Sequence, residues 1–496
     1  MVKFLVIGGG IAGVTCAEQL SALRSDCQIS LISSSPLIKA VTNFQQYARS
    51  LEKFTVEERP LSTLNNQYSN IAVFHKTAKN LDSSKHTLTT EDGEIFQYDK
   101  LCICSGASPK IIDSKSDRVI GIRDTESVTH FQNLLANSKR VMIVGNGGIA
   151  TELVHEITNC RIIWTIKDDS ISSTFFDVGA GQFLLPKLFT PGDEESDNTL
   201  SKRMKFTLDD DTSDSDLAKN NFGSALGPDW SRNLKISGGL SESQPKVGNQ
   251  IQVEYNCEVA SILSYSEYRN LLSLESNNTD EKVSSSSSNE VWPIYVKLTN
   301  GKLYGCDFVI SATGVTPNID LVKNDPNFQI GKDGGIVVDD HMKTRVANIY
   351  AAGDVCCAGW DHAPHWFQMR LWTQARQMGS YAAKCMVADT ENDSISMDFC
   401  FELFAHVTKF FDYKVVLLGQ YNAQKLGKDY EILLRCTKDM EFIKVILHKG
   451  RMYGAIIIGE TDLEETFENL ILNQMDLSRF GESLLDPSID IEDYFD

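Results

Sequence analysis

A glycine-rich turn between an apolar strand and a helix occurs twice in this chain, and no other feature constrains the fold as strongly. The first copy follows the apolar run Phe4–Ile7 and spans residues 8–13, and the second follows residues 140–144 and spans residues 145–150. A glycine turn between a buried strand and an apolar helical repeat is typical of dinucleotide binding. The sequence therefore predicts two dinucleotide-binding folds of the α/β class.

In the first copy, glycine occupies all three required positions, Gly8, Gly10 and Gly13. We expect Gly8 to permit the tight turn, Gly10 to let the backbone approach a pyrophosphate, and Gly13 to let the helix pack on the strand. The first helical turn would offer free N–H groups to the phosphates. Where a ribose-binding acid is usual, at the end of the second strand, the chain has Ser33, whose hydroxyl would bind a ribose more weakly.

The second copy is G-x-G-x-x-A, with Gly145, Gly147 and Ala150 at the three positions. A further strand at residues 161–166 leads to Lys167 and Asp168, which point to different nicotinamides. Lys167 could bind the 2′-phosphate of NADPH, whereas Asp168 could bind the 2′-hydroxyl of NADH or repel that phosphate. The two residues are adjacent, so the choice between NADH and NADPH stays open.

Three further segments make the chain resemble the FAD-dependent pyridine nucleotide–disulphide oxidoreductase superfamily over nearly its whole length. Residues 98–107 resemble a strand that leads into the family's A-T-G-A turn, residues 310–318 match its second such turn, and residues 349–354 match its second FAD motif. The resemblance implies FAD in the first fold, NAD(P)H in the second, and hydride transfer from nicotinamide to flavin N5. It also implies that Asp354 binds the ribityl chain of FAD.

The motifs and the resemblance together give two sets of candidate binding residues. The FAD set is Gly8, Gly10, Ile11, Ala12, Gly13, Ser33, Lys39, Ala78, Ser105, Gly106, Gly353 and Asp354. The NAD(P)H set is Gly145, Gly147, Gly148, Ile149, Ala150, Glu152, Lys167, Asp168, Thr313 and Gly314. Lys39 lies where relatives carry a basic residue near the cofactor phosphates, and a solvated surface lysine is the alternative. No metal site is predicted.

The resemblance also divides the chain into domains. It implies two Rossmann-like dinucleotide-binding domains, with the NAD(P)H-binding domain (residues 126–305) inserted between two parts of the FAD-binding domain (residues 1–125 and 306–398). Residues 399–496 are expected to form a C-terminal α+β domain, because they resemble the last domain of nitrite-reductase-like flavoproteins.

Acidic residues are concentrated in two places outside this predicted core. The formal net charge is −20; residues 190–290 hold 18 acidic and 9 basic side chains, and residues 461–496 hold 11 acidic and one basic. We expect an acidic insertion around residues 186–245 and a serine-rich loop around residues 265–290, both partly disordered. The insertion is either a spacer or a segment that docks a protein partner, and the acidic tail is a second candidate for docking.

The same charge excludes some functions. An acidic chain is poorly suited to neutralise the phosphates of nucleic acid or to dock on anionic lipid. The N-terminal segment lacks the apolar region of a signal peptide, and no apolar run approaches the roughly 20 residues that span a bilayer. We therefore expect no direct nucleic-acid or membrane partner and a cytoplasmic location, with the nucleus as a second compartment.

The cysteines depart from the family pattern. Disulphide reductases relay electrons through a redox-active cysteine pair, either on a helix after the first glycine motif or as C-x-x-C in the NAD domain. Here the first place reads KAVTNF at residues 39–44, and C-x-x-C does not occur in the sequence. We interpret Cys102, Cys104, Cys356 and Cys357 as packing thiols. The usual disulphide reductase activity (EC 1.8.1.-) is therefore not expected.

Two functional hypotheses remain. The first is an FAD-dependent NAD(P)H oxidoreductase whose electrons leave directly from flavin to an unknown acceptor such as oxygen, a quinone, a small disulphide or a protein. The second is a slow-turnover flavoprotein, gated by NAD(P)H, that binds or shields an oxidation-sensitive protein partner.

Overall fold

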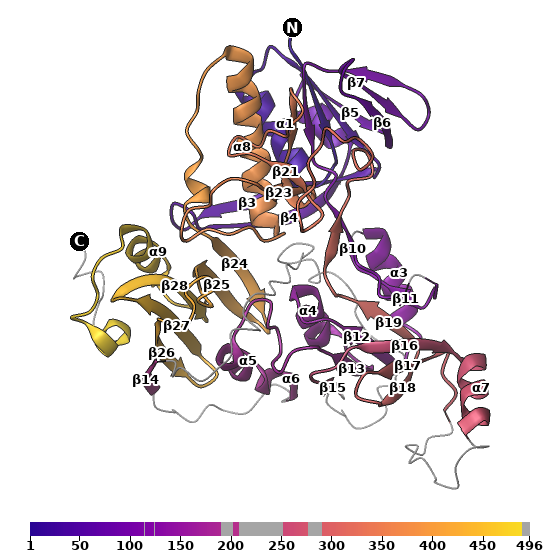
Figure 1. Ribbon diagram of the computed structural model, residues 1–496, viewed down its shortest axis with the longest axis vertical. Coiled ribbons are helices and arrows are strands. Elements are labelled where there is room, and N and C mark those ends of the chain that lie inside the picture. The colour runs from indigo at the N-terminus through magenta and orange to yellow at the C-terminus, as the bar shows by residue number, and fades with distance from the viewer. Residues whose placement is uncertain (114, 124, 190–201, 208–250, 276–289, 489–496) are drawn as a thin grey trace.

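A computed structural model describes residues 1–113, 115–123, 125–189, 202–207, 251–275 and 290–488. It has three lobes, with the first nucleotide domain at the top of Figure 1, the second at the lower right and the C-terminal domain at the lower left. Most of the predicted acidic insertion, much of the serine-rich loop and the last eight residues (489–496) lie outside the described part of the chain.

The first domain is built on a parallel sheet with the strand order β22-β9-β1-β2-β5. Its strands are β1 (Lys3–Ile7), β2 (Gln28–Ser33), β5 (Ile71–His75), β9 (Lys100–Ile103) and β22 (Ile349–Ala351). The four strands other than the edge strand β5 are rich in apolar residues that are almost fully buried, as expected of a sheet covered on both faces, whereas most of β5 is only partly buried. Helices α1 (Ile11–Leu23) and α8 (Trp372–Glu391) lie side by side in this domain (Figure 1).

The second domain repeats this arrangement with the parallel order β11-β19-β12-β13-β15. Its elements are β11 (Val119–Ile120), α3 (Thr125–Leu135), β12 (Arg140–Val144), α4 (Gly148–Glu156), β13 (Arg161–Thr165), β15 (Ile251–Glu254) and β19 (Phe308–Ser311). In both sheets, the strand before the glycine turn lies between the strand that follows the turn's helix and a strand that arrives much later in the chain. The predicted pair of Rossmann-like domains is confirmed.

Two short strands carry the chain between these domains. β10 (Ala107–Pro109) and β20 (Val315–Pro317) pair antiparallel, one leaving the first domain and the other returning to it. They follow the two turns at Gly106 and Gly314, which both have positive φ. The second domain is thus inserted in the first through a two-stranded connection.

The C-terminal domain contains an antiparallel sheet with the order β14-β26-β27-β28-β25-β24. Its elements are β14 (Lys202–Thr207), β24 (Ala405–Phe410), β25 (Tyr413–Gly419), β26 (Glu431–Thr437), β27 (Glu441–His448), β28 (Arg451–Ile458) and α9 (Glu464–Asn473). The predicted α+β class is confirmed. The edge strand β14 comes from the predicted insertion, so part of that insertion belongs to the C-terminal sheet.

A long antiparallel ribbon, β3 (Leu37–Gln46) and β4 (Glu52–Pro60), joins the first domain to the C-terminal domain. At its tip, Leu51 is fully buried in the C-terminal core, and the Ser50 backbone N–H donates to Glu468 Oε1 at 2.9 Å. Residues 39–44, where the resemblance to disulphide reductases implies a helix, lie in strand β3. Polar and β-branched residues such as Thr42, Thr55 and Val56 suit a half-exposed ribbon.

Smaller elements complete the described chain. They are α2 (Ser62–Gln67), β6 (Ala78–Asp82), β7 (Thr87–Thr90), β8 (Ile95–Gln97), α5 (Val178–Leu184), α6 (Pro186–Phe189), β16 (Val259–Ser264), α7 (Tyr265–Glu275), β17 (Ile294–Leu298), β18 (Leu303–Cys306), β21 (Ile336–Val338) and β23 (Cys356–Ala358). The prediction of a serine-rich loop from about residue 265 was wrong at its start. Residues 265–275 form helix α7, in which Tyr268 stacks on Tyr295 with ring centroids 3.7 Å apart.

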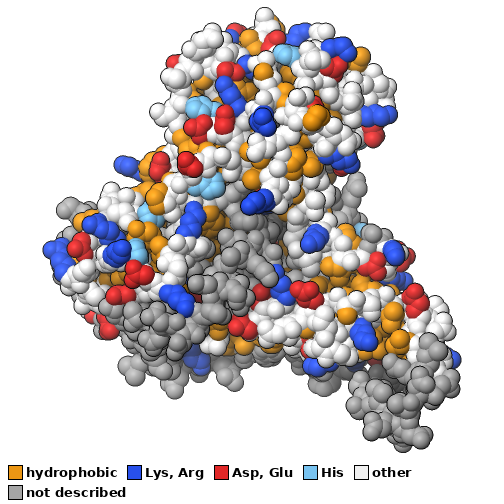
Figure 2. All heavy atoms as spheres, viewed as in Figure 1, with side chains coloured by type: hydrophobic (Ala, Val, Ile, Leu, Met, Phe, Trp, Pro, Cys, Tyr) orange, Lys and Arg blue, Asp and Glu red, His pale blue; other side chains and the backbone are white. Residues whose placement is uncertain are grey.

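On the face shown in Figure 2, acidic and basic side chains are interspersed over the described surface rather than gathered into one charged patch. Outside residues 190–290 and 461–496 the sequence holds 38 acidic and 37 basic side chains, and the mixed surface agrees with that balance. No described helix combines the length and apolarity needed to cross a membrane.

Candidate functional site

At two positions of the first glycine turn, Gly8 and Gly13, a Cβ would collide with a backbone carbonyl oxygen. Gly8 has φ +119°, and a Cβ there would lie 2.1 Å from the carbonyl oxygen of Cys104. A Cβ on Gly13 would lie 2.0 Å from the carbonyl oxygen of Gly8, so the helix packs directly on the turn. Gly10, in contrast, is extended at φ −78°, and a Cβ on it would meet no atom within 4 Å. The backbone at Gly10 is therefore open to a ligand.

The second glycine turn has the same construction. Gly145 has φ +129°, and a Cβ there would lie 2.1 Å from the carbonyl oxygen of Ala312. Ala150 is fully buried where the helix packs on the strand. A Cβ on Gly147 would meet only Thr174 Oγ1, at 3.8 Å. The central glycine is again open.

Both turns fit the pyrophosphate of a dinucleotide. Gly10 and Gly147 are the N-cap residues of α1 and α4, and neither helix has a side-chain cap. The first-turn N–H groups, including those of the predicted residues Ile11, Ala12, Gly148 and Ile149, therefore lie at helix ends that can bind phosphate oxygens. Glu152 lies one turn farther along α4.

The second FAD motif packs against the first. Gly353 has φ +78°, and a Cβ on it would lie 2.8 Å from the Cβ of Ala12 in the first turn of α1. A Cβ on Gly379 of α8 would similarly lie 2.2 Å from the carbonyl oxygen of Ala12. Glycine at both places brings the 353–354 turn and α8 up to the start of α1.

The carboxylate of Asp354 is surrounded by cations. Burial raises its pKa, while Arg123, Arg370 and Lys39 lower it through their charges. The Arg370 Nε–H donates to the Asp354 carbonyl oxygen at 2.9 Å, and no described residue donates a hydrogen bond to the Asp354 carboxylate. A partly exposed carboxylate without a hydrogen-bond donor fits the hydroxyl groups of a ribityl chain.

Lys39 lies inside this cluster rather than on the solvated surface. Its backbone N–H donates to the Gly9 carbonyl oxygen at 2.9 Å, and its Nζ donates to the Arg123 carbonyl oxygen at 3.3 Å. Beside it, Gly106 has φ +68°, and a Cβ there would lie 2.5 Å from Arg123 Nη2. Ser105 Oγ donates to the Asn318 carbonyl oxygen at 2.7 Å. The structure thus brings together Lys39, Ser105, Gly106 and the 353–354 turn.

The predicted ribose end is arranged differently. The Ser33 hydroxyl donates to the Ser35 carbonyl oxygen at 2.9 Å and accepts from the Ser35 N–H at 3.2 Å. Ser33 could donate a hydrogen bond to a ribose hydroxyl only if this local turn opened, because its single hydroxyl proton is already donated. Ala78 follows β5, and the Lys76 N–H donates to the Ser33 carbonyl oxygen at 2.8 Å, so Ala78 lies at the same edge of the sheet as Ser33.

A residue that the sequence analysis missed organises the corresponding end of the second domain. Asn146, buried inside the glycine turn, donates from Nδ2 to Asp168 Oδ2 and Ser173 Oγ, both at 2.8 Å. Asp168 is therefore held against the turn, whereas Lys167 is exposed. The only hint in the sequence was that Asn146, with its polar amide side chain, occupies a variable position of the second glycine motif. Across the turn, Thr313 Oγ1 donates to the Lys110 carbonyl oxygen at 3.2 Å, and Gly314 has φ +104°.

A second missed residue, His406 of β24, lies against the N-terminus of α8. Its Nδ1 lies 3.2 Å from Thr373 Oγ1, and its ring centroid lies 4.8 Å from that of Trp372. Burial lowers the pKa of His406 to about 3, so the ring is neutral at physiological pH. Leu371, the N-cap of α8, gives no side-chain cap, so this helix end also offers free N–H groups. Nothing in the local sequence connects β24 with α8.

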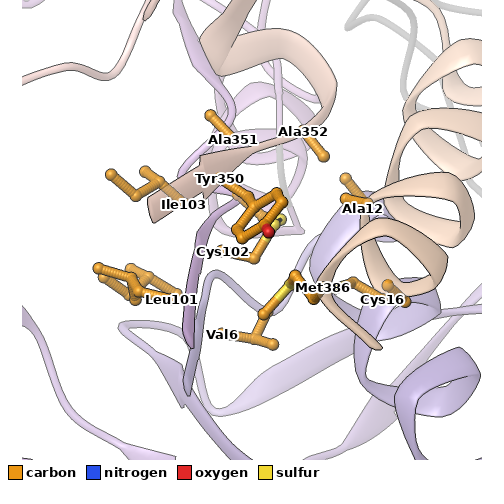
Figure 3. Packing of buried hydrophobic residues seen from close by; sticks show 14 of the residues in the cluster. Val6, Ala12, Cys16, Leu101, Cys102, Ile103, Tyr350, Ala351, Ala352 and Met386 are labelled. Atoms are coloured by element: carbon orange, nitrogen blue, oxygen red, sulfur yellow. Dashed lines mark hydrogen bonds between the residues drawn. The ribbon is translucent and has the colours of Figure 1, made fainter. Parts of the chain in front are cut away.

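The twelve cysteines are all described, and all are free thiols. Cys102 and Cys104 approach each other at 3.5 Å between sulfur atoms, and both are buried. Figure 3 shows Cys102 among apolar side chains, with Cys16 of α1 and Met386 of α8 nearby. Cys356 is buried and donates to the Gly353 carbonyl oxygen, and burial raises the pKa of Cys357 to about 11. The packing interpretation agrees with this burial.

Comparison with known proteins identifies the family. The family model described as pyridine nucleotide-disulphide oxidoreductase matches residues 2–167 and 274–379. A Homo sapiens protein described as pyridine nucleotide-disulfide oxidoreductase domain-containing protein 1 is 54% identical over 497 residues, which cover 100% of this chain and 98% of that protein. A Dictyostelium discoideum protein of the same description is 41% identical and covers 100% of this chain and 99% of its own.

Among solved structures, the fold is similar to that in the covalent putidaredoxin reductase–putidaredoxin complex. That chain is 14% identical with a TM-score of 0.66, and the match covers 100% of this chain and 98% of that one. The resemblance expected from the motifs is confirmed by the full-length relatives, and this chain belongs to the pyridine nucleotide-disulphide oxidoreductase family.

Proposed function

We propose that this oxidoreductase uses FAD and NAD(P)H and that its electrons leave bound flavin directly for an acceptor. The observation that carries the proposal is the pair of open glycine turns, Gly10 and Gly147, each at an uncapped helix N-terminus. When bound, FAD would take a hydride from NAD(P)H at N5 and pass the electrons on.

The chain's own residues would bind and orient these groups. The turns at Gly10 and Gly147 would hold the two pyrophosphates, and the Asp354 carboxylate would accept hydrogen bonds from the ribityl hydroxyls. The N-terminus of α8, with Trp372 and Thr373 in its first turn, would stabilise negative charge at the pyrimidine end of a reduced flavin. Neutral His406 would fix the orientation of Thr373 through its Nδ1 contact.

The burial and the raised pKa of the cysteine thiols support the direct exit of electrons from flavin. A disulphide relay needs an accessible thiolate of lowered pKa. The Cys102 and Cys356 side chains are fully buried, and burial raises the pKa of Cys356. At the place of the relay helix, the ribbon strand β3 contains no cysteine.

The test is anaerobic rapid mixing of the purified flavoprotein with NADH and with NADPH, followed by a panel of acceptors. We expect bleaching of the flavin absorbance by at least one nicotinamide, and reoxidation by oxygen, a quinone or a one-electron redox protein that is faster than by glutathione disulphide. Protein without flavin, or flavin that both nicotinamides leave oxidised, would refute the proposal. Fast reoxidation by the disulphide that is lost when Cys356 or Cys357 is replaced by serine would refute direct exit, because it would show that a protein thiol relays the electrons.

A second candidate function is favoured by strand β14. A segment of the acidic insertion, residues 202–207, pairs with β26 at the edge of the C-terminal sheet, so part of the insertion belongs to a folded domain. The candidate is a slow flavoprotein that shields an oxidation-sensitive protein docked on the insertion or the acidic tail, in the cytoplasm or nucleus. Deleting residues 210–245 while keeping β14 should remove that partner from pull-downs without changing flavin reduction. Unchanged capture by this variant and by a chain shortened at residue 488 would exclude it.

A further inference from the structure

A cavity lies on the first domain away from the glycine turns. Its volume is about 270 Å³, and it is bounded by α1, α8 and the ribbon strand β3. Helix α1 contributes Thr15, Glu18 and Gln19, which share one helical face because they are three and four residues apart. This face begins more than one turn after the N-terminus of α1, so the cavity is separate from the predicted pyrophosphate site.

The carboxylate of Glu18 is the charged group of this cavity that lacks a partner. It is half-buried, burial raises its pKa, and no described residue donates a hydrogen bond to it. The charges of Arg59 and Arg376 lower that pKa, yet both guanidinium groups are already paired. Arg59 forms an ion pair with Glu57 at 2.8 Å, and Arg376 forms one with Glu52 at 2.8 Å.

Arg376 is held a second time, which keeps it from turning to Glu18. Its guanidinium carbon lies 4.2 Å from the ring centroid of Phe44, and Phe44 itself lines the cavity and is 43% exposed. Tyr68 lines the cavity as a second aromatic residue, and burial raises the pKa of its hydroxyl, so it remains neutral. The cavity therefore combines an uncompensated carboxylate with aromatic and hydroxyl-bearing walls.

These features select the charge of a ligand. An anion would be repelled by Glu18, and a neutral apolar ligand would bury the carboxylate further without a partner, which is costly. A cation with N–H donors could pair with Glu18 while its apolar stem contacts Phe44 and Tyr68, and aromatic faces attract such cations.

We propose that this cavity binds an organic monocation, an ammonium or guanidinium head on an apolar stem, with Glu18 as its counter-ion. The head belongs either to a free amine or guanidine or to a lysine or arginine side chain of a protein partner. Neither source depends on the proposed redox function.

The test uses the full chain with its flavin and isothermal titration of propylguanidinium, with propylurea as the neutral ligand of the same shape. We expect propylguanidinium to bind at least about tenfold more tightly than propylurea. Glu18→Gln should lower the affinity for propylguanidinium by at least about tenfold. Glu91→Gln, an exposed acid in another part of the domain, should leave that affinity unchanged. Because Glu18 lacks a hydrogen-bond donor, Glu18→Gln should unfold at the same temperature as the parent chain or higher.

A third arm distinguishes the two sources. An acetylated Gly-Arg-Gly peptide amide that binds more tightly than propylguanidinium would assign the site to a partner's side chain, and weaker binding would assign it to a free small cation. Equal affinity of the parent chain and Glu18→Gln for propylguanidinium, or no binding by either at millimolar concentration, would overturn the proposal.

Discussion

Replacing Gly147 with alanine separates ligand binding from folding at the second glycine turn. The residue has φ −94° and ψ −176°, a backbone conformation that alanine adopts freely. The new methyl group would meet only Thr174 Oγ1 at 3.8 Å, an ordinary van der Waals contact. We therefore expect the free energy of unfolding of the ligand-free protein to change by less than about 1 kcal/mol.

The same methyl group would stand where the pyrophosphate must approach the backbone. Displacing a phosphate from two first-turn N–H groups removes two charge-assisted hydrogen bonds of about 1.5 kcal/mol each or more. A loss of about 3 kcal/mol corresponds to an affinity for NAD(P)H lowered by roughly 100-fold. Gly10→Ala should act in the same way on FAD, because a Cβ there meets nothing within 4 Å.

The assay measures three quantities on Gly147→Ala and Gly10→Ala: the flavin content, the calorimetric affinity for NAD(P)H and the urea unfolding curve. We expect Gly147→Ala to retain flavin and lose nicotinamide affinity, and Gly10→Ala to lose flavin. Gly145→Ala is the contrasting control, since its Cβ would lie 2.1 Å from a carbonyl oxygen and should destabilise the fold. Normal NAD(P)H affinity in Gly147→Ala would refute the assignment of the pyrophosphate to this turn. A large loss of stability would refute the inference that a methyl group fits at residue 147 without a clash.

Three further variants test other contacts. Asp177→Asn removes the charge that pairs at 2.7 Å with buried Lys444 and should lower the free energy of unfolding by about 2 kcal/mol. The loss is smaller than for a fully buried pair because Asp177 is 34% exposed. Urea unfolding measures this loss, and an unchanged free energy of unfolding would contradict the pairing. Burial raises the pKa of Asp389, but hydrogen bonds from Lys100 and two other groups hold it below its usual 3.8. The parent chain should therefore exceed Asp389→Asn in stability at pH 7. The difference should begin to shrink as the pH falls below 3.8 and should be lost only when the pH passes the lowered pKa of the folded state. A difference that does not shrink in acid would refute this. Cys102→Ala should lose about 1 kcal/mol of stability and keep the parent's anaerobic rate of flavin reduction, and a slower rate would indicate a thiol role.

The two nucleotide folds were predictable because their constraints are local in sequence. Gly8 and Gly145 each face a carbonyl oxygen at a distance that excludes any Cβ, so glycine at these positions reports the turn directly. The turns at Gly106 and Gly314 could be predicted from the sequence for a related reason, because a backbone with positive φ favours glycine. Motif and geometry agree at these sites.

The rest depends on contacts between distant segments. Leu51 is buried because the ribbon tip packs into a core formed by residues beyond 400. The sequence of the ribbon alone does not indicate that it packs against this domain. The hydroxyl of Ser33 could have faced a ribose, but its own backbone two residues later competes for it. Asp168 reaches Asn146 because β12 and β13 pair in parallel and end at the same edge of the sheet, and His406 meets Thr373 only through domain packing. Composition and periodicity do not encode such pairings.

Strand β14 has a consequence for the order in which the chain assembles. Residues 202–207 are synthesised well before residues 431–437, with which they pair, so the sheet edge cannot close until the C-terminal domain has emerged. Such non-local pairing is slow, because a long loop must close before any contact stabilises it. Once formed, it covers the backbone groups of β26 that would otherwise template pairing between molecules. Amide exchange should find this edge to be the first part of the C-terminal sheet to open, and a chain that lacks β14 should aggregate while its two nucleotide domains fold.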